Sequence, residues 1–108
     1  MNDLATVRCR PEGHRLVAHL SGEIDVSNAH EVGASIERAV PKDVHAVVVD
    51  LSEIRYLDSS GISLLLRLSE RLRARRIDLR LAVPPQAPVR AVLELTGLGR
   101  MLHTEEPA

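Results

Sequence analysis

The order of apolar and polar residues predicts strands at the beginning and in the middle of the chain. Residues 4–10 and 15–22 read as two short strands, and Pro11 and Gly13 between them are typical of a turn. Residues 44–51, VHAVVVDL, are apolar without alternation, which indicates a central strand covered on both faces, as in parallel sheets. We therefore expect an N-terminal hairpin next to a buried strand at the middle of a sheet.

Three later segments have the spacing of apolar residues that is typical of amphipathic helices. The first, residues 27–40, has Ser27 or Asn28 as its cap and Pro41 as its stop. The second and third helices are expected at residues 60–75 and 89–95. Two further strands are expected at residues 77–83 and, shorter, at residues 101–106.

Strands that alternate with helices after a first hairpin predict an α/β fold. We expect a mostly parallel central sheet with an antiparallel N-terminal edge hairpin and with helices packed on it. The chain has 108 residues, which is the length of one ordinary domain, and it contains no internal repeat and no linker. A single domain spanning residues 1–108 is therefore predicted.

Composition and charge argue against several classes of function. Hydrophobic residues make up 44% of the chain, so it can bury a core without a metal or a disulfide. A net charge of −1 and one aromatic residue, Tyr56, provide neither a basic surface nor a stacking platform for nucleic acid. The chain has no signal-peptide pattern and no apolar run of membrane-spanning length. We expect a cytoplasmic protein that binds no nucleic acid and inserts into no membrane.

The residues that most often bind metals or react with oxidants are sparse. Cys9 is the only cysteine, and we interpret it as a small strand residue that forms no disulfide. The five histidines are scattered without the spacing of metal ligands. No metal site, no cofactor and no catalytic residue is therefore predicted.

Polar side chains follow two of the expected strands, in the segments GEIDVSN and SEIRYLDSSG. The first contributes Glu23 and Asp25, and the second contributes Asp58, Ser59 and Ser60. Because the carboxyl ends of parallel strands meet at one edge of a sheet, we expect a binding site at this edge. Each segment leads directly into a predicted helix.

The tetrad of Asp58, Ser59, Ser60 and Gly61 contains more than the start of a helix needs. One capping side chain is enough to accept hydrogen bonds from the free N–H groups of the first turn. An exposed serine there is also a good phosphorylation site, because a phosphate would gain free backbone donors and the favourable helix dipole. The residues alone leave both interpretations open.

Three segments, in this order, resemble the STAS-domain anti-sigma factor antagonists of bacteria: LSGEIDVSNA, VVVDLSEIRYLDSSGISLLL and LELTGL. The resemblance extends from the first strand to about Met101. Its most specific part is the DSSG tetrad after an apolar strand that ends in DLS. It implies a binding protein that is itself no enzyme.

The resemblance also implies a partner-switching mechanism. In this family the serine immediately before the glycine is phosphorylated by a partner that is both anti-sigma factor and serine kinase, and Ser60 matches that serine. The unphosphorylated form is expected to bind the kinase and so free a sigma factor, and a PP2C-type phosphatase is expected to regenerate it. Ser59 is expected to serve mainly as the cap. The residues expected at the partner contact are Glu23, Asp25, Asp58, Ser59, Ser60 and Gly61.

The sequence offers three alternatives to this function. A phosphoryl-accepting receiver would use Asp50 at the end of its central strand, but Lys42 is wrongly placed for it and an acidic pair is missing. A hydrolase built on Ser60 lacks the G-x-S-x-G pattern. The main alternative is a STAS scaffold subunit in a signalling assembly or a transport complex, in which Ser60 is never modified. The sequence leaves open whether the free protein forms a weak homodimer, and for Asp25 and Asp58 it leaves helix capping and solubility as the alternative role.

Overall fold

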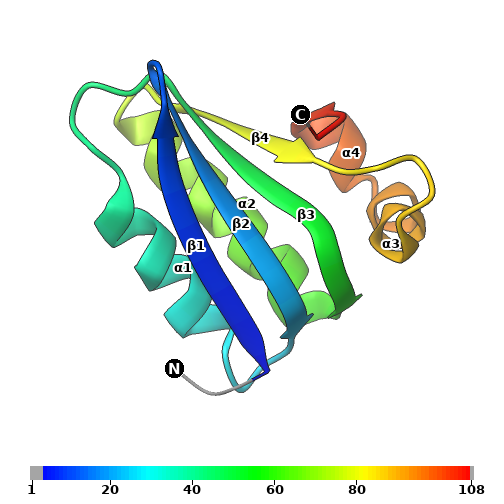
Figure 1. Cartoon of the computed structure of the whole chain (residues 1–108). Coiled ribbons are helices and arrows are strands. Elements are labelled where there is room, and N and C mark those ends of the chain that lie inside the picture. The colour runs from blue at the N-terminus through cyan, green and yellow to red at the C-terminus, as the bar shows by residue number, and fades with distance from the viewer. Residues whose placement is uncertain (1–3, 108) are drawn as a thin grey trace.

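The computed structural model describes residues 4–107, and a five-stranded sheet lies at its centre (Figure 1). The strands lie across the sheet in the order in which they follow along the chain. The first pair is antiparallel and each later neighbouring pair is parallel, which confirms the predicted fold class. The strands are β1 (Ala5–Glu12), β2 (Arg15–Ile24), β3 (Ala46–Leu57), β4 (Asp78–Ala82) and β5 (His103–Glu105).

Within residues 4–107 the structure has four helices, of which three were predicted. α1 and α2 cover one face of the sheet, and α3 and α4 lie beside it on the side of β4 (Figure 1). The fourth helix was not predicted: Gly97, with φ +74°, ends α3 and turns the chain directly into α4. The helices are α1 (Ala29–Ala39), α2 (Ser59–Ala74), α3 (Pro88–Thr96) and α4 (Leu98–Met101).

β3 is longer than its apolar run predicted, and its second half carries the chain to the candidate site. Residues 52–57 were expected to form a loop, but they continue the strand. The register with β2 shifts twice, so β3 has extra residues opposite β2. These irregularities change the spacing of the buried residues from two to three, with Leu51, Ile54 and Leu57 buried. This part of the strand was not predicted because its apolar and polar residues do not alternate strictly.

The main core lies between the sheet and the helices. Alternate residues of the strands face α1 and α2, and the helices contribute the stripes that their spacing predicted, including Leu65, Leu68 and Leu72 of α2. Burying each of these leucines contributes about 2 kcal/mol to the free energy of unfolding. Cys9 is half-buried in β1 beside this core, and burial raises the pKa of its thiol. The interpretation of Cys9 as a strand residue is confirmed.

β3 was expected to be covered on both faces, but no helix within residues 4–107 covers its second face. Here Val17, Val48 and Ala82 form a small separate cluster of strand residues. Charged side chains, not a helix, surround this cluster. The expectation was wrong because a buried valine can be covered either by a helix or by long polar side chains. An apolar run in the sequence does not distinguish these two kinds of cover.

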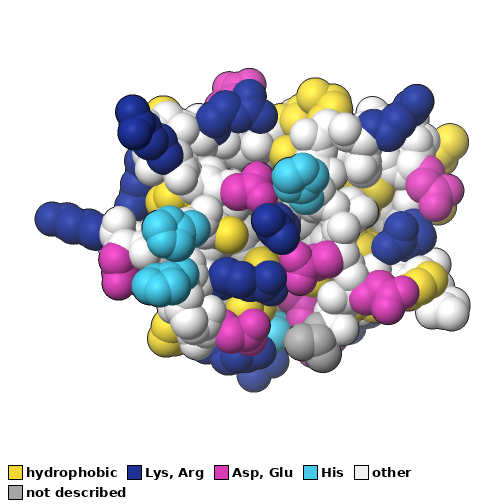
Figure 2. Space-filling view, turned by 90° about the horizontal axis from the view of Figure 1, so that it is seen from above, with side chains coloured by type: hydrophobic (Ala, Val, Ile, Leu, Met, Phe, Trp, Pro, Cys, Tyr) yellow, Lys and Arg dark blue, Asp and Glu magenta, His cyan; other side chains and the backbone are white. Residues whose placement is uncertain are grey.

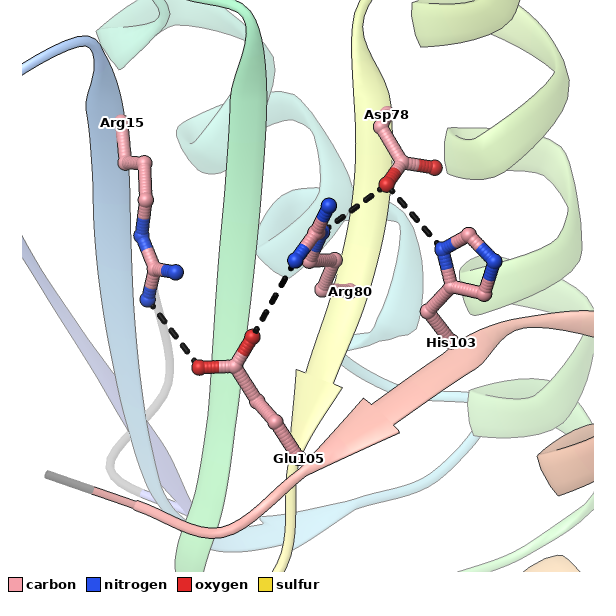
Figure 3. Close-up of polar contacts among 5 residues, drawn as sticks. All are labelled: Arg15, Asp78, Arg80, His103 and Glu105. Atoms are coloured by element: carbon pink, nitrogen blue, oxygen red, sulfur yellow. Dashed lines mark hydrogen bonds and ion pairs between the residues drawn. The ribbon is translucent and has the colours of Figure 1, made fainter.

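A chain of polar contacts on this face joins β5 to β4 and β2 (Figure 3). Glu105 accepts a hydrogen bond from Arg15 at 3.1 Å and lies 3.9 Å from Arg80. Arg80 and His103 both contact the carboxylate of Asp78, at 2.9 and 3.2 Å. Partial burial raises the pKa of Asp78, but the hydrogen bonds from Arg80 and His103 outweigh burial and lower it. Such partly exposed pairs contribute little stability individually.

Charges of both signs are mixed at the end of the molecule where β1 and β2 are joined (Figure 2). Basic, acidic and histidine side chains alternate over this surface, so no extended patch of one sign is seen in this view. This end lies away from the segments that follow β2 and β3 (Figure 1). The segments of the candidate site thus lie at the other end of the sheet.

Candidate functional site at the carboxyl ends of β2 and β3

Two neighbouring parallel strands end side by side and begin the candidate site. Ile24, the last residue of β2, lies opposite Leu57, the last residue of β3. The backbone N–H of Asp58 donates to the carbonyl of Ile24 at 3.4 Å. The connection to α1 is therefore only residues 25–28, and the connection to α2 is Asp58 alone. The second connection is much shorter than the sequence predicted, and the first lies two residues further along the chain.

Asp25 organises the first connection. Its carboxylate accepts hydrogen bonds from the backbone N–H and the hydroxyl of Ser27, at 2.8 and 2.5 Å. Asn28 is buried and ties the ends of the loop together, since its side chain accepts from the Asp25 N–H and donates to the Glu23 carbonyl. Asn28 occupies the N-cap position of α1, one of the two predicted, but its side chain makes no capping hydrogen bond.

Replacement of Ser27 with alanine is expected to raise the pKa of Asp25. The hydrogen bond from the Ser27 hydroxyl, and after it the one from the Ser27 backbone, holds this pKa below the ordinary range of an aspartate. A pKa that is lower in the folded than in the unfolded state stabilises the fold at pH values above the unfolded pKa, and this stabilisation disappears as the pH falls. The stability difference between Ser27→Ala and the unmodified protein should therefore be smallest at low pH. Titration of the Asp25 carboxyl carbon by NMR measures the shift, and an unchanged midpoint would contradict the assigned bond.

Asp58 alone caps α2. Its carboxylate accepts from the N–H groups of Ser60 and Gly61, at 2.8 and 3.4 Å, and its carbonyl accepts from Ile62. The expectation that Ser59 is mainly the cap is therefore wrong. The expectation that a phosphate on Ser60 finds free backbone donors also needs correction, because Asp58 already occupies those of Ser60 and Gly61. The two serines have no capping task in this structure.

Asp58→Ala is expected to lower the free energy of unfolding by about 1 kcal/mol, the usual cost of losing a helix N-cap. Asp58→Asn is the matched variant, since an asparagine oxygen still accepts the hydrogen bonds and caps about as well. Urea denaturation of both variants should place the asparagine protein close to the unmodified one. Equal destabilisation by the two substitutions would show that the charge of Asp58, not its capping bonds, stabilises α2.

Gly61 allows the first turn of α2 to pack closely against the ends of β2 and β3. A Cβ atom on Gly61 would lie 2.1 Å from Cδ1 of Leu57 and 3.4 Å from Cγ2 of Ile24. Contacts below 3 Å cannot be accommodated without movement of the neighbours. Gly61 therefore serves the packing that fixes where Ser60 lies.

Ser59 and Ser60 open into a hollow of about 330 Å³ between α1 and α2. Ser59 is exposed and Ser60 is half-buried, and neither hydroxyl has a hydrogen-bond partner among residues 4–107. Sequence reasoning missed the other polar residues of this hollow. Arg67 follows Ser63 by four residues and Ser60 by seven, the spacing of one helix face, and this signal could have been found. The complete lining is Val26, Ala29, His30, Ser59, Ser60, Ser63 and Arg67.

Glu23 lies apart from this hollow. It pairs in register with Tyr56, and alternation along the strands turns both side chains to the face opposite Ile24 and Leu57. Tyr56 is half-exposed there. Of the six predicted contact residues, the structure thus groups Asp58, Ser59, Ser60 and Gly61 at the start of α2, with Asp25 on the neighbouring connection.

The described residues provide neither a cluster for a metal ion nor a membrane span. Within residues 4–107 no three side chains of histidine, cysteine, aspartate or glutamate converge on a point that a metal could occupy. None of the helices in the same part of the chain is long and apolar enough to cross a membrane.

Comparison with known proteins identifies relatives of this fold and sequence. Residues 6–107 match the model of the STAS domain family. BtrV of Bordetella bronchiseptica, a candidate anti-sigma factor antagonist, is 32% identical over 83 residues, which cover 76% of this chain and 70% of that protein.

Solved structures share the fold. An anti-sigma factor antagonist from Mycobacterium paratuberculosis has a TM-score of 0.81 and 27% identity, with 96% of this chain and 86% of that chain covered. The Bacillus protein SpoIIAA in its phosphorylated form has a TM-score of 0.65 and 23% identity, with 93% and 91% covered. The family match and the curated relative together show that this chain belongs to the STAS-domain anti-sigma factor antagonist family.

Proposed function

We propose that this protein is a cytoplasmic anti-sigma factor antagonist that phosphorylation of Ser60 switches off. In its unphosphorylated form it binds a cognate anti-sigma factor that is also a serine kinase, and the sigma factor is released. The kinase transfers the γ-phosphoryl group of ATP to Oγ of Ser60, ADP leaves, and the hydroxyl proton is lost. A PP2C-type phosphatase hydrolyses the phosphoester and restores the binding form. The protein is thus a substrate and a binding partner, not a catalyst.

The main support for the proposal is the environment of the Ser60 hydroxyl. Asp58 performs the capping, so the hydroxyl has no structural task, and it opens into a hollow at the end of the sheet. The short connection and the packing of Gly61 hold Ser60 on a rigid helix start. The fold also accommodates the modification, since SpoIIAA has this fold in both its unphosphorylated and its phosphorylated form.

Electrostatics explains how the modification would release the partner. A phosphate adds a charge of about −1.5 to −2 beside the carboxylate of Asp58 and near the connection that carries Asp25. A partner surface that fits this acidic edge when Ser60 is free would meet additional negative charge and bulk. Like-charge contacts across an interface cost several kcal/mol, whereas a hundredfold loss of affinity needs only about 2.7 kcal/mol.

Phosphorylation in a purified system tests the proposal. The protein is incubated with ATP and, in turn, with each anti-sigma factor kinase of the organism from which it comes, and the product is mapped by peptide mass spectrometry. We expect one kinase to place one phosphate on Ser60, on Ser59→Ala as well, and none on Ser60→Ala. A phosphate on Ser59 would overturn the residue assignment, and no phosphate with any kinase would favour the unmodified scaffold.

A further inference from the structure

We propose that the hollow between α1 and α2 receives the phosphate of Ser60, with Arg67 and His30 as its binding residues. The inference deepens the proposed function and rests on it for its role in cells. It assigns functions to two residues that neither the sequence motif nor the capping of α2 involves. The modification then changes the surface between the two helices and leaves their packing in place.

Two main-chain donors at the start of α2 are already in use. Asp58 already accepts from the N–H groups of Ser60 and Gly61. A phosphate that took these donors would displace the cap and would sit against the carboxylate of Asp58. The repulsion between the two anions favours a phosphate that turns away from Asp58, and Ser60 already lines the hollow.

Arg67 is placed to meet a phosphate in the hollow. Seven residues of helix separate the Cα atoms of Ser60 and Arg67 by about 10 Å along the axis. Side chains on a helix lean toward its N-terminus, so the guanidinium of Arg67 extends toward Ser63 and Ser60, with which it lines the hollow. The guanidinium is exposed and has no hydrogen bond or ion pair with any other residue in the range 4–107. It is therefore available for the bidentate pairing that arginine makes with phosphate.

His30 lies on the other wall of the hollow. It is the second residue of α1 and is exposed, and its imidazole forms no hydrogen bond with any residue that the structure describes. A second, smaller hollow of about 70 Å³ is lined by His30 and Arg67 together with Glu37 and Arg71. Arg71 lies 3.4 Å from Glu37 and so is paired. Arg67 is thus the unpaired cation of α2 in this groove among the described residues.

Titration of the phosphate by ³¹P NMR tests the inference without any kinase. Phosphoserine is introduced at position 60 during translation, and the titration midpoint of the phosphate is compared in the parent protein and in Arg67→Gln. A nearby guanidinium stabilises the dianion, so we expect the midpoint to rise by about one pH unit in Arg67→Gln. His30→Gln should raise it by less, and high salt should reduce both effects.

The matched control is Arg73→Gln, which removes the same charge from the exposed face of α2 nearly two turns further along. We expect Arg73→Gln to leave the midpoint unchanged, and all variants to keep the thermal unfolding midpoint of the parent. Equal midpoints in the parent and in Arg67→Gln, or equal shifts from Arg67→Gln and Arg73→Gln, would overturn the inference. Neither result would affect the proposed switch, which is tested separately by phosphorylation of Ser60 with a purified kinase.

Discussion

Gly61→Val is expected to lower the free energy of unfolding by about 3 kcal/mol, the upper range for overpacking a close contact. The first carbon alone would lie 2.1 Å from Cδ1 of Leu57, a residue that is itself 5% exposed and held between the sheet and the helices. Two further methyl groups increase the conflict. Urea denaturation, followed by circular dichroism, measures the loss.

The control for this substitution is Gly99→Ala in α4. A Cβ atom there would have its nearest neighbour, a methyl group of Thr104, at 4.0 Å, which is ordinary van der Waals contact. We expect Gly99→Ala to be neutral or slightly stabilising, because alanine is the better helix former. If Gly61→Val were as stable as the unmodified protein, α2 could not begin as close to β2 and β3 as the structure places it.

Ser60→Asp is expected to weaken binding to the anti-sigma factor by about a hundredfold, which corresponds to about 2.7 kcal/mol. The substitution adds a permanent negative charge at the position of the proposed phosphate, next to Asp58. Ser60→Ala should bind as tightly as the unmodified protein and should resist phosphorylation, because the hydroxyl has no hydrogen-bond partner among the described residues to lose. Isothermal titration calorimetry with the purified partner measures both affinities.

A change of net charge alone must be separated from this local effect. Lys42→Gln changes the net charge by the same amount as Ser60→Asp. Lys42 is exposed and follows the C-terminal end of α1, whereas the hollow is lined by Ala29 and His30 at the N-terminal end of that helix. We expect this variant to bind with unchanged affinity. Equal affinities for Ser60→Asp and Ser60→Ala would contradict the electrostatic mechanism of release.

Much of the fold follows from local patterns in the sequence. The ends of α1, α2 and α3 lie within two residues of the predicted ones, because caps, proline and glycine mark them. The extension of β3 could not be read in the same way, since its register shifts replace the two-residue period by a three-residue one. α4 is a single turn, too short to show a helical period.

The candidate site, too, could be predicted from the sequence only in part. Asp58, Ser59, Ser60 and Gly61 are contiguous, so the sequence predicts their grouping directly. Which residue caps α2 depends on side-chain orientation, and the structure assigns this task to Asp58 instead of Ser59. His30 enters the hollow only because α1 packs beside α2, and a contact between two helices is not visible in either one's sequence.

Peptide mapping of the protein purified from its own cells tests the central claim most directly, with phosphatase-treated protein as the control. The account predicts a single phosphate on Ser60 that phosphatase removes and whose occupancy changes with growth conditions, including entry into stress or stationary phase. The absence of phosphate on Ser60 under every condition would contradict the proposed switch.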